Sequence, residues 1–194
     1  MMLRLEHALI DPTVQFIPHL GYVDLAWCRQ DEHLATKHAA RIGELAQKHE
    51  SPYLRVFALT SSGIDKFVSR DYVGAIHDFK ACLELAHSVR AALEYEPETL
   101  ASLAECNYAL GNFDAAIAYA RDAIDVATQR SARLPHCRSL IIYAAAMLAK
   151  GNGARLQDVE DSLLKAESLI AMSGAKIYEP LLQRERARMS ALVS

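Results

Sequence analysis

The sequence lacks the features that mark a membrane protein or a nucleic-acid-binding protein. No apolar run approaches the roughly 20 residues that a membrane-spanning helix requires. The stretch MMLRLEHALIDPTVQF has early charges and no apolar core of the kind found in signal peptides. The net charge is only −3 at pH 7, so there is no basic surplus to attract nucleic acid or an anionic membrane. We therefore expect a cytoplasmic protein with no nucleic-acid and no membrane partner.

Cysteine is scarce and widely spaced. The sequence has four cysteines and no CxxC pair; they are Cys28, Cys82, Cys106 and Cys137. Each lies in a segment with helical periodicity, at a semi-apolar position. This pattern is typical of reduced, buried thiols in a cytoplasmic protein, whereas a zinc site needs closely spaced ligands.

Patterns typical of catalysis are also missing. The chain has no GxxxxGK[ST] loop to hold a nucleotide phosphate. Ser61-Ser62-Gly63 lacks the strand–turn–helix context of a nucleophile elbow. The spacing of His33 from His38 does not place both cleanly on one helix face. We therefore predict no catalytic residue, no cofactor and no metal.

The sequence does contain an internal repeat. The segment DEHLATKHAARIGELA, from Asp31, is similar to DYVGAIHDFKACLELA, from Asp71, and a looser third copy surrounds Asp114. The aligned apolar positions are Ala35, Ala39, Ile42, Leu45 and Ala46 in the first copy, Ala75, Phe79, Cys82, Leu85 and Ala86 in the second, and Ala116, Ala120, Ala123, Val126 and Ala127 in the third. Self-similarity at a period of about 40 residues indicates an α-helical repeat array.

Helix start and stop residues divide the chain at regular intervals. Asp31, Ser51-Pro52, Asp71 and Gly111-Asn112 are among them, and the apolar residues between them recur every three or four positions. The predicted helix pairs are 13–29 with 31–49, 52–68 with 71–90, 95–110 with 112–130, and 134–150 with 155–173, followed by a ninth helix over 176–193. The short connections between them predict antiparallel neighbours.

These segments resemble the tetratricopeptide (TPR) repeat family. The second-helix signature of that family, Ala followed four positions later by Phe, is present as Ala75 and Phe79, whereas its first-helix signature is eroded. The resemblance implies an all-α, right-handed superhelix of antiparallel helix pairs. It would form a single domain over 1–194, with pairs over 13–49, 52–90, 95–130 and 134–173 and a capping helix over 176–193.

Three phrases resemble the C-terminal region of large bacterial signalling proteins: LEHALIDP, LASLAECNYALGNFDAAI and SGAKIYEPLLQRERARM. In those proteins a class III adenylate/guanylate cyclase or a DNA-binding module is joined to a P-loop ATPase and then to TPRs. The resemblance implies that this chain is the sensor or scaffold segment of such a protein, without its catalytic domains.

In a TPR array the first helix of each pair lines the inner groove. The register of the aligned alanines predicts seven groove residues: Asp24, Trp27, Thr60, Ile64, Phe67, Glu105 and Tyr108. Trp27 and Tyr108 could anchor a peptide, because aromatic residues contribute heavily at binding hot spots. Alternatively, these rings pack between repeats, or the groove receives a neighbouring domain or the last helix of the chain.

Three functions follow as hypotheses, none of them catalytic. The chain is a regulatory segment that binds a partner or the neighbouring domains of its own polypeptide. Alternatively, it is a free-standing adaptor that binds a peptide in its groove. The third hypothesis is a scaffold that forms a homodimer through the apolar side of its last helix.

Overall fold

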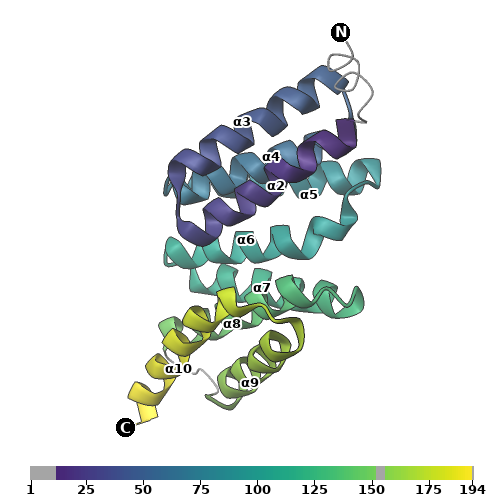
Figure 1. The fold of residues 1–194 in the computed structure, drawn as a ribbon. Coiled ribbons are helices and arrows are strands. Elements are labelled where there is room, and N and C mark those ends of the chain that lie inside the picture. The colour runs from purple at the N-terminus through teal and green to yellow at the C-terminus, as the bar shows by residue number, and fades with distance from the viewer. Residues whose placement is uncertain (1–11, 152–155, 194) are drawn as a thin grey trace. The chain divides into compact units, whose positions relative to one another are not determined.

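The computed structural model describes residues 12–151 and 156–193, and these ranges fold into α-helices without a strand (Figure 1). The predicted all-α class is confirmed. The helices are α2 (Pro12–Arg29), α3 (Glu32–His49), α4 (Pro52–Val68), α5 (Tyr72–Val89), α6 (Glu96–Ala109), α7 (Phe113–Gln129), α8 (Arg133–Lys150), α9 (Leu156–Ser173) and α10 (Glu179–Val193). Two short 3₁₀ turns, η1 (Leu93–Tyr95) and η2 (Lys176–Tyr178), precede α6 and α10.

The helices begin where the sequence places a capping side chain. Asp31 and Asp71 accept hydrogen bonds from the backbone N–H groups of Leu34 and Gly74, and Ser51 accepts one from Leu54. Each of these bonds satisfies a donor that the first helical turn would leave unpaired. The predicted bounds are therefore close to the observed ones. The exception is the last helix, which begins at Glu179 because residues 176–178 form the 3₁₀ turn η2.

The chain divides into two compact units, Met1–Leu93 and Glu94–Ser194, which we call the N-terminal and C-terminal units. In the N-terminal unit α2, α3, α4 and α5 pack in succession, and α2 also packs against α4. The rings of Phe16 on α2 and Phe57 on α4 have centroids 4.8 Å apart. Gly63 on α4 lies directly against the ring of Phe79 on α5. Aromatic side chains therefore fill the centre of this unit.

The C-terminal unit packs in the same order. Helices α6, α7, α8 and α9 contact one another in succession, α6 also contacts α8, and α10 packs on α8 and α9. Its core is rich in alanine, which lets helices approach closely; the cluster around α7 comprises Ala104, Ala116, Ile117, Ala120, Ile142, Tyr143, Ala145 and Ala146. The smaller residues of this core contrast with the aromatic centre of the N-terminal unit.

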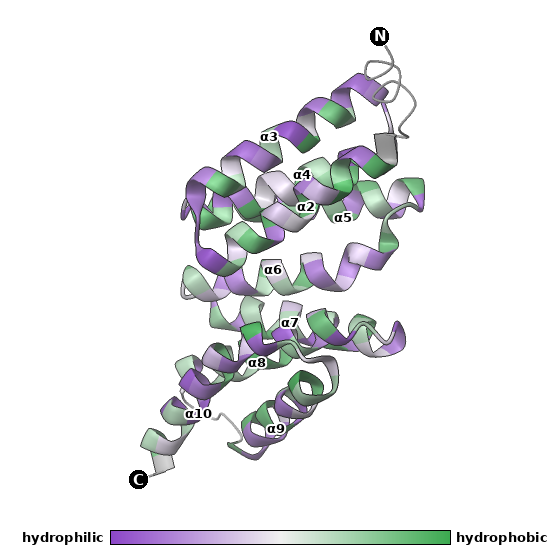
Figure 2. Ribbon diagram, in the orientation of Figure 1, coloured by the Kyte–Doolittle hydropathy of each residue, from purple (hydrophilic) through white to green (hydrophobic). Residues whose placement is uncertain are grey.

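The repeat found in the sequence is a packing repeat. Ala35, Ala75 and Ala116 are aligned in sequence, lie on α3, α5 and α7, and are all fully buried. Most of the other aligned positions are buried as well, and Figure 2 shows hydrophilic and hydrophobic residues alternating along α3. Every second helix, from α3 through α5 to α7, therefore buries an equivalent stripe. The TPR superhelix and the single domain over 1–194 stay predictions, and the segment 5–11 within LEHALIDP lies outside the described residues.

Candidate interaction surfaces

The predicted groove residues of the N-terminal unit differ in their exposure. Asp24 on α2 is exposed, and Trp27 is half-buried. On α4, Thr60 is 1% and Ile64 5% exposed, whereas Phe67 is half-buried. Thr60 and Ile64 therefore face other helices of the unit and do not line an open surface.

The contacts of α4 explain this burial. The hydroxyl of Thr60 donates to the carbonyl of Val56 and lies 3.1 Å from Sγ of Cys82 on α5. The ring of Phe67 packs edge-on against Tyr72, which begins α5. This side of α4 is therefore part of the interior.

In the C-terminal unit, Glu105 and Tyr108 belong to a polar network on α6, α8 and α10. The guanidinium of Arg138 on α8 donates to both carboxylate oxygens of Glu105, over 2.9 and 2.6 Å, and also bonds Glu98. Arg138 is 4% exposed. Burial alone would lower the pKa of Arg138, but the carboxylates of Glu105 and Glu98 together raise it. The charge is therefore held in place by two anions from α6.

The last helix makes a further set of polar contacts with α6. Arg188 on α10 donates to the hydroxyl of Tyr108 over 2.9 Å and to Glu185 over 2.7 Å. Glu185 is fully buried and also accepts a hydrogen bond from Arg184. Tyr178, at the start of α10, is buried, and its pKa is raised by burial and then by the negative charge of Glu98. Tyr108 on α6 is thus bonded to the chain's own last helix, one of the alternatives that the sequence left open.

The sequence contains a signal for this arrangement. The tripeptide Tyr-Glu-Pro occurs at 95–97 and again at 178–180. Both copies end a 3₁₀ turn and begin a helix, α6 in one case and α10 in the other. By this signature α10 corresponds to the first helix of a further pair.

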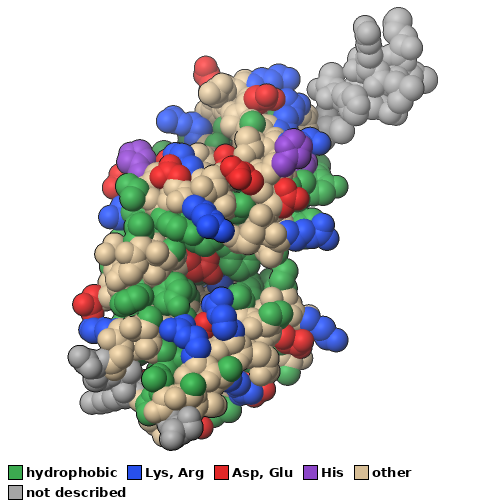
Figure 3. All heavy atoms as spheres, turned by 90° about the vertical axis from the view of Figure 1, so that its left-hand side faces the viewer, with side chains coloured by type: hydrophobic (Ala, Val, Ile, Leu, Met, Phe, Trp, Pro, Cys, Tyr) green, Lys and Arg blue, Asp and Glu red, His purple; other side chains and the backbone are tan. Residues whose placement is uncertain are grey.

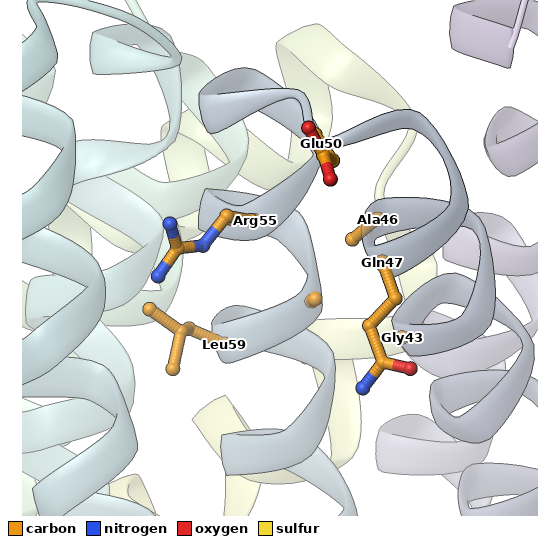
Figure 4. A pocket seen from close by; sticks show the side chains of 7 residues that line it. Gly43, Ala46, Gln47, Glu50, Arg55 and Leu59 are labelled. Atoms are coloured by element: carbon orange, nitrogen blue, oxygen red, sulfur yellow. The ribbon is translucent and has the colours of Figure 1, made fainter.

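An open groove lies elsewhere, between α3 and α4 of the N-terminal unit (Figure 4). Its volume is about 750 Å³, and it is lined by Gly43, Ala46, Gln47, Glu50, Arg55, Ala58 and Leu59. Gly43, Ala46 and Gln47 line it from α3, and Arg55, Ala58 and Leu59 line it from α4. Within the part of the chain that the structure describes, the side chain of Arg55 makes no ion pair or hydrogen bond.

Sequence reasoning missed this groove because it joins the second helix of one pair to the first helix of the next. The signal that could have indicated it is the run of positions 43, 46 and 47 on α3, which share one helix face and include two small residues. The matching run on α4 is 55, 58 and 59. Facing small residues leave room that larger side chains would fill.

A second polar cluster involves Asp78 on α5. Its carboxylate accepts hydrogen bonds from Ser62 and Lys66, both over 2.6 Å, and lies 3.3 Å from Nδ1 of His77. Burial would raise the pKa of Asp78, but these partners together lower it. In a nucleophilic triad the imidazole lies between the hydroxyl and the carboxylate. Here Ser62 bonds the carboxylate directly, so the cluster ties α4 to α5.

The buried thiols are poorly suited to nucleophilic chemistry. Burial raises the pKa of Cys106 to about 12 and that of Cys137 to about 11. A thiol is reactive as its thiolate, and little thiolate forms at neutral pH when the pKa is so high. No disulfide joins any of the four cysteines.

Within residues 12–151 and 156–193, no three His, Cys, Asp or Glu side chains gather in a way that could hold a metal ion. None of the helices in those ranges is both long and apolar enough to cross a bilayer. On the face shown in Figure 3, acidic and basic side chains are interspersed.

The chain matches no model of a known protein family and no curated protein. The likeness to the TPR family, and to the signalling proteins that carry TPRs, is therefore a resemblance of short motifs.

Proposed function

We propose that this chain is a non-catalytic protein-interaction module of the TPR type, acting in the cytoplasm. The observation that carries the proposal is the repeated burial of Ala35, Ala75 and Ala116 at one helical register on α3, α5 and α7. Arrays of stacked helix pairs present extended surfaces to protein ligands. The proposal includes no cofactor, no metal and no nucleic-acid or membrane partner.

The groove between α3 and α4 is the surface we assign to the partner. Its floor of Gly43, Ala46 and Ala58 lets a peptide backbone approach, and Leu59 offers apolar contact. The guanidinium of Arg55 is available to a carboxylate, with which arginine forms strong bidentate hydrogen bonds. The partner we infer is a protein segment that carries an apolar side chain beside an acidic residue.

The resemblance to multidomain regulators supports a larger context. We propose that the chain is the C-terminal sensor or scaffold segment of a cyclase- or regulator-linked ATPase. Reading the gene in frame upstream of Met1 tests this. An open frame that contains GxxxxGK[ST] supports the proposal, and a stop codon immediately upstream of Met1 overturns it in favour of a free-standing adaptor.

The homodimer stays a further alternative. Leu182 on α10, like Tyr178 in the turn η2 before it, is buried within the C-terminal unit, so a dimer would need another surface. Leu192, which is 62% exposed, lies near the end of that helix. Light scattering at high protein concentration tests for the dimer, which a monomeric mass would exclude.

A further inference from the structure

Two histidines meet where α2 packs on α3. Nδ1 of His19 on α2 lies 2.7 Å from Nδ1 of His38 on α3, and their ring centroids are 5.0 Å apart. Tyr22, one turn after His19, stacks on the ring of His38 with centroids 4.4 Å apart. At this distance the N–H at one Nδ1 donates a hydrogen bond to the other Nδ1. At least one of the two imidazoles must therefore be neutral.

The charged groups around the pair are cationic. Lys37 and Arg41, both on α3, act on the two imidazoles and disfavour their protonation. Helix α4 packs against both α2 and α3 and carries the acidic residue Asp65. The carboxylate of Asp65 accepts a hydrogen bond from the hydroxyl of Thr36. The pKa of His19 is lowered mainly by burial and then by these cations. The pKa of His38 is lowered mainly by burial and then by His19.

Helix α2 is held mainly by its neighbours. It contains Pro18, which removes a helical hydrogen bond, and Gly21, which adds backbone entropy to the unfolded segment. Val14 and Ile17 are more than half exposed, so part of its apolar surface gains nothing from packing. A helix with these features opens at a lower free energy than the rest of its unit.

Helix α2 also covers part of α4. Phe16 packs on Phe57, which is 1% exposed, and edge-on against Tyr53. We propose that the His19–His38 pair is a proton-controlled latch that holds α2 over this face of α4. The latch is closed while the Nδ1 of one imidazole has no proton and accepts a hydrogen bond from the Nδ1 of the other.

Acid opens the latch through a simple change in protonation. When both rings are protonated, each Nδ1 carries a proton, so no lone pair is left to accept the hydrogen bond. Two imidazolium groups then repel one another beside Lys37 and Arg41. Release of α2 uncovers Phe57. The regulatory use of this release rests on the proposed function, but the latch itself is tested without a partner.

The test uses the full chain and its one tryptophan, Trp27, which lies on α2. Acrylamide quenching of Trp27 and hydrogen exchange of the α2 amides are measured at about pH 7.5 and about pH 5.5, on either side of the ordinary histidine pKa. After correction for intrinsic exchange, we expect the opening equilibrium of α2 to rise as the pH falls, by at most about tenfold for each histidine that takes up a proton on opening.

Two variants separate the latch from general acid sensitivity. His38→Gln keeps a polar side chain but cannot gain the charge, so the increase should shrink to that of His19 alone. His33→Gln alters an exposed histidine of the same helix and should leave the wild-type increase intact. The amides of α7 serve as an internal control for global unfolding. The proposal is overturned if α2 of the wild type shows the same protection at both pH values, or if His38→Gln retains the full increase.

Discussion

The buried guanidinium of Arg138 ties α8 to two carboxylates of α6. Truncation by Arg138→Ala would leave Glu98 and Glu105 without their counter-charge in a water-poor site. Removing one partner of a buried ion pair costs about 3–5 kcal/mol. We therefore expect a loss of that size in the free energy of unfolding, measured by urea denaturation.

Arg130→Ala is the matched control. Arg130 also pairs with a glutamate of α6, Glu96, but its side chain is 35% exposed. Exposed pairs contribute about 0–1 kcal/mol, so this variant should unfold at nearly the wild-type urea concentration. Equal losses for the two variants would show that the buried network does not hold the C-terminal unit together.

Two helical glycines give opposite predictions. A Cβ added at Gly63 would lie 2.6 Å from the ring of Phe79, whereas one added at Gly43 meets nothing within 4 Å. We expect Gly63→Ala to lower the free energy of unfolding by about 1–3 kcal/mol, because the ring must shift. Gly43→Ala should raise it by about 0.5–1 kcal/mol through helix propensity. Thermal melts followed by circular dichroism would show both, and a stable Gly63→Ala protein would contradict the packing described here.

His136 contributes a pH dependence of known sign. Its pKa is lowered by burial and then by Lys165, and its Nε2 has no hydrogen-bond partner in the described structure. The unfolded chain takes up a proton that the folded state resists. The contribution of neutral His136 to the free energy of unfolding is therefore fully present above the ordinary histidine pKa of about 6.5. It is lost as the pH falls below that value. His136→Gln should flatten the dependence of the urea midpoint on pH, and an unchanged slope would exclude this role.

At the scale of the helices, close packing depends on the aligned alanines. Ala75 lies on α5 at a fully buried position of the repeat. Ala75→Arg would force a long charged side chain into that contact, and the cost of burying an unpaired charge exceeds the stability of an ordinary domain. We expect no cooperative melt by circular dichroism. A variant that melts like the wild type would mean that the repeat register is wrong.

The positions of the helices could be predicted from the sequence because local chemistry determines them. Asp31, Ser51 and Asp71 cap helices through bonds to residues three positions ahead, and the apolar period identifies the buried stripe. Glu105 and Tyr108 were likewise predicted to share one side of their helix. Their pairing could not be predicted, because it depends on how α6, α8 and α10 approach one another.

The open surface could not be predicted for a related reason. Helical register tells which residues share a face but not which neighbour covers that face. Thr60 and Ile64 share a side of α4 that packs into the interior of its unit. The groove between α3 and α4 depends instead on small residues from two helices that belong to different pairs.

At the scale of the whole chain, the two units differ in what their surfaces offer. The N-terminal unit has an open groove lined by Arg55, whose guanidinium has no partner among the residues that the structure describes, and a histidine pair that joins α2 to α3. In the C-terminal unit, Arg138 bonds α8 to α6, and Arg188 bonds α10 to α6. We therefore expect a protein ligand to engage the N-terminal unit.

The most direct test is affinity capture from a lysate of the source organism with three forms of the full chain. They are the wild type, a double variant Arg55→Ala/Leu59→Ala in the groove, and Arg41→Ala, which removes an exposed charge on α3. Circular dichroism first establishes that all three are folded. We expect the wild type and Arg41→Ala to retain the same protein, and the groove variant to lose it. Retention of the same proteins by all three forms, or of none by the wild type, would contradict an interaction module that binds through α3 and α4.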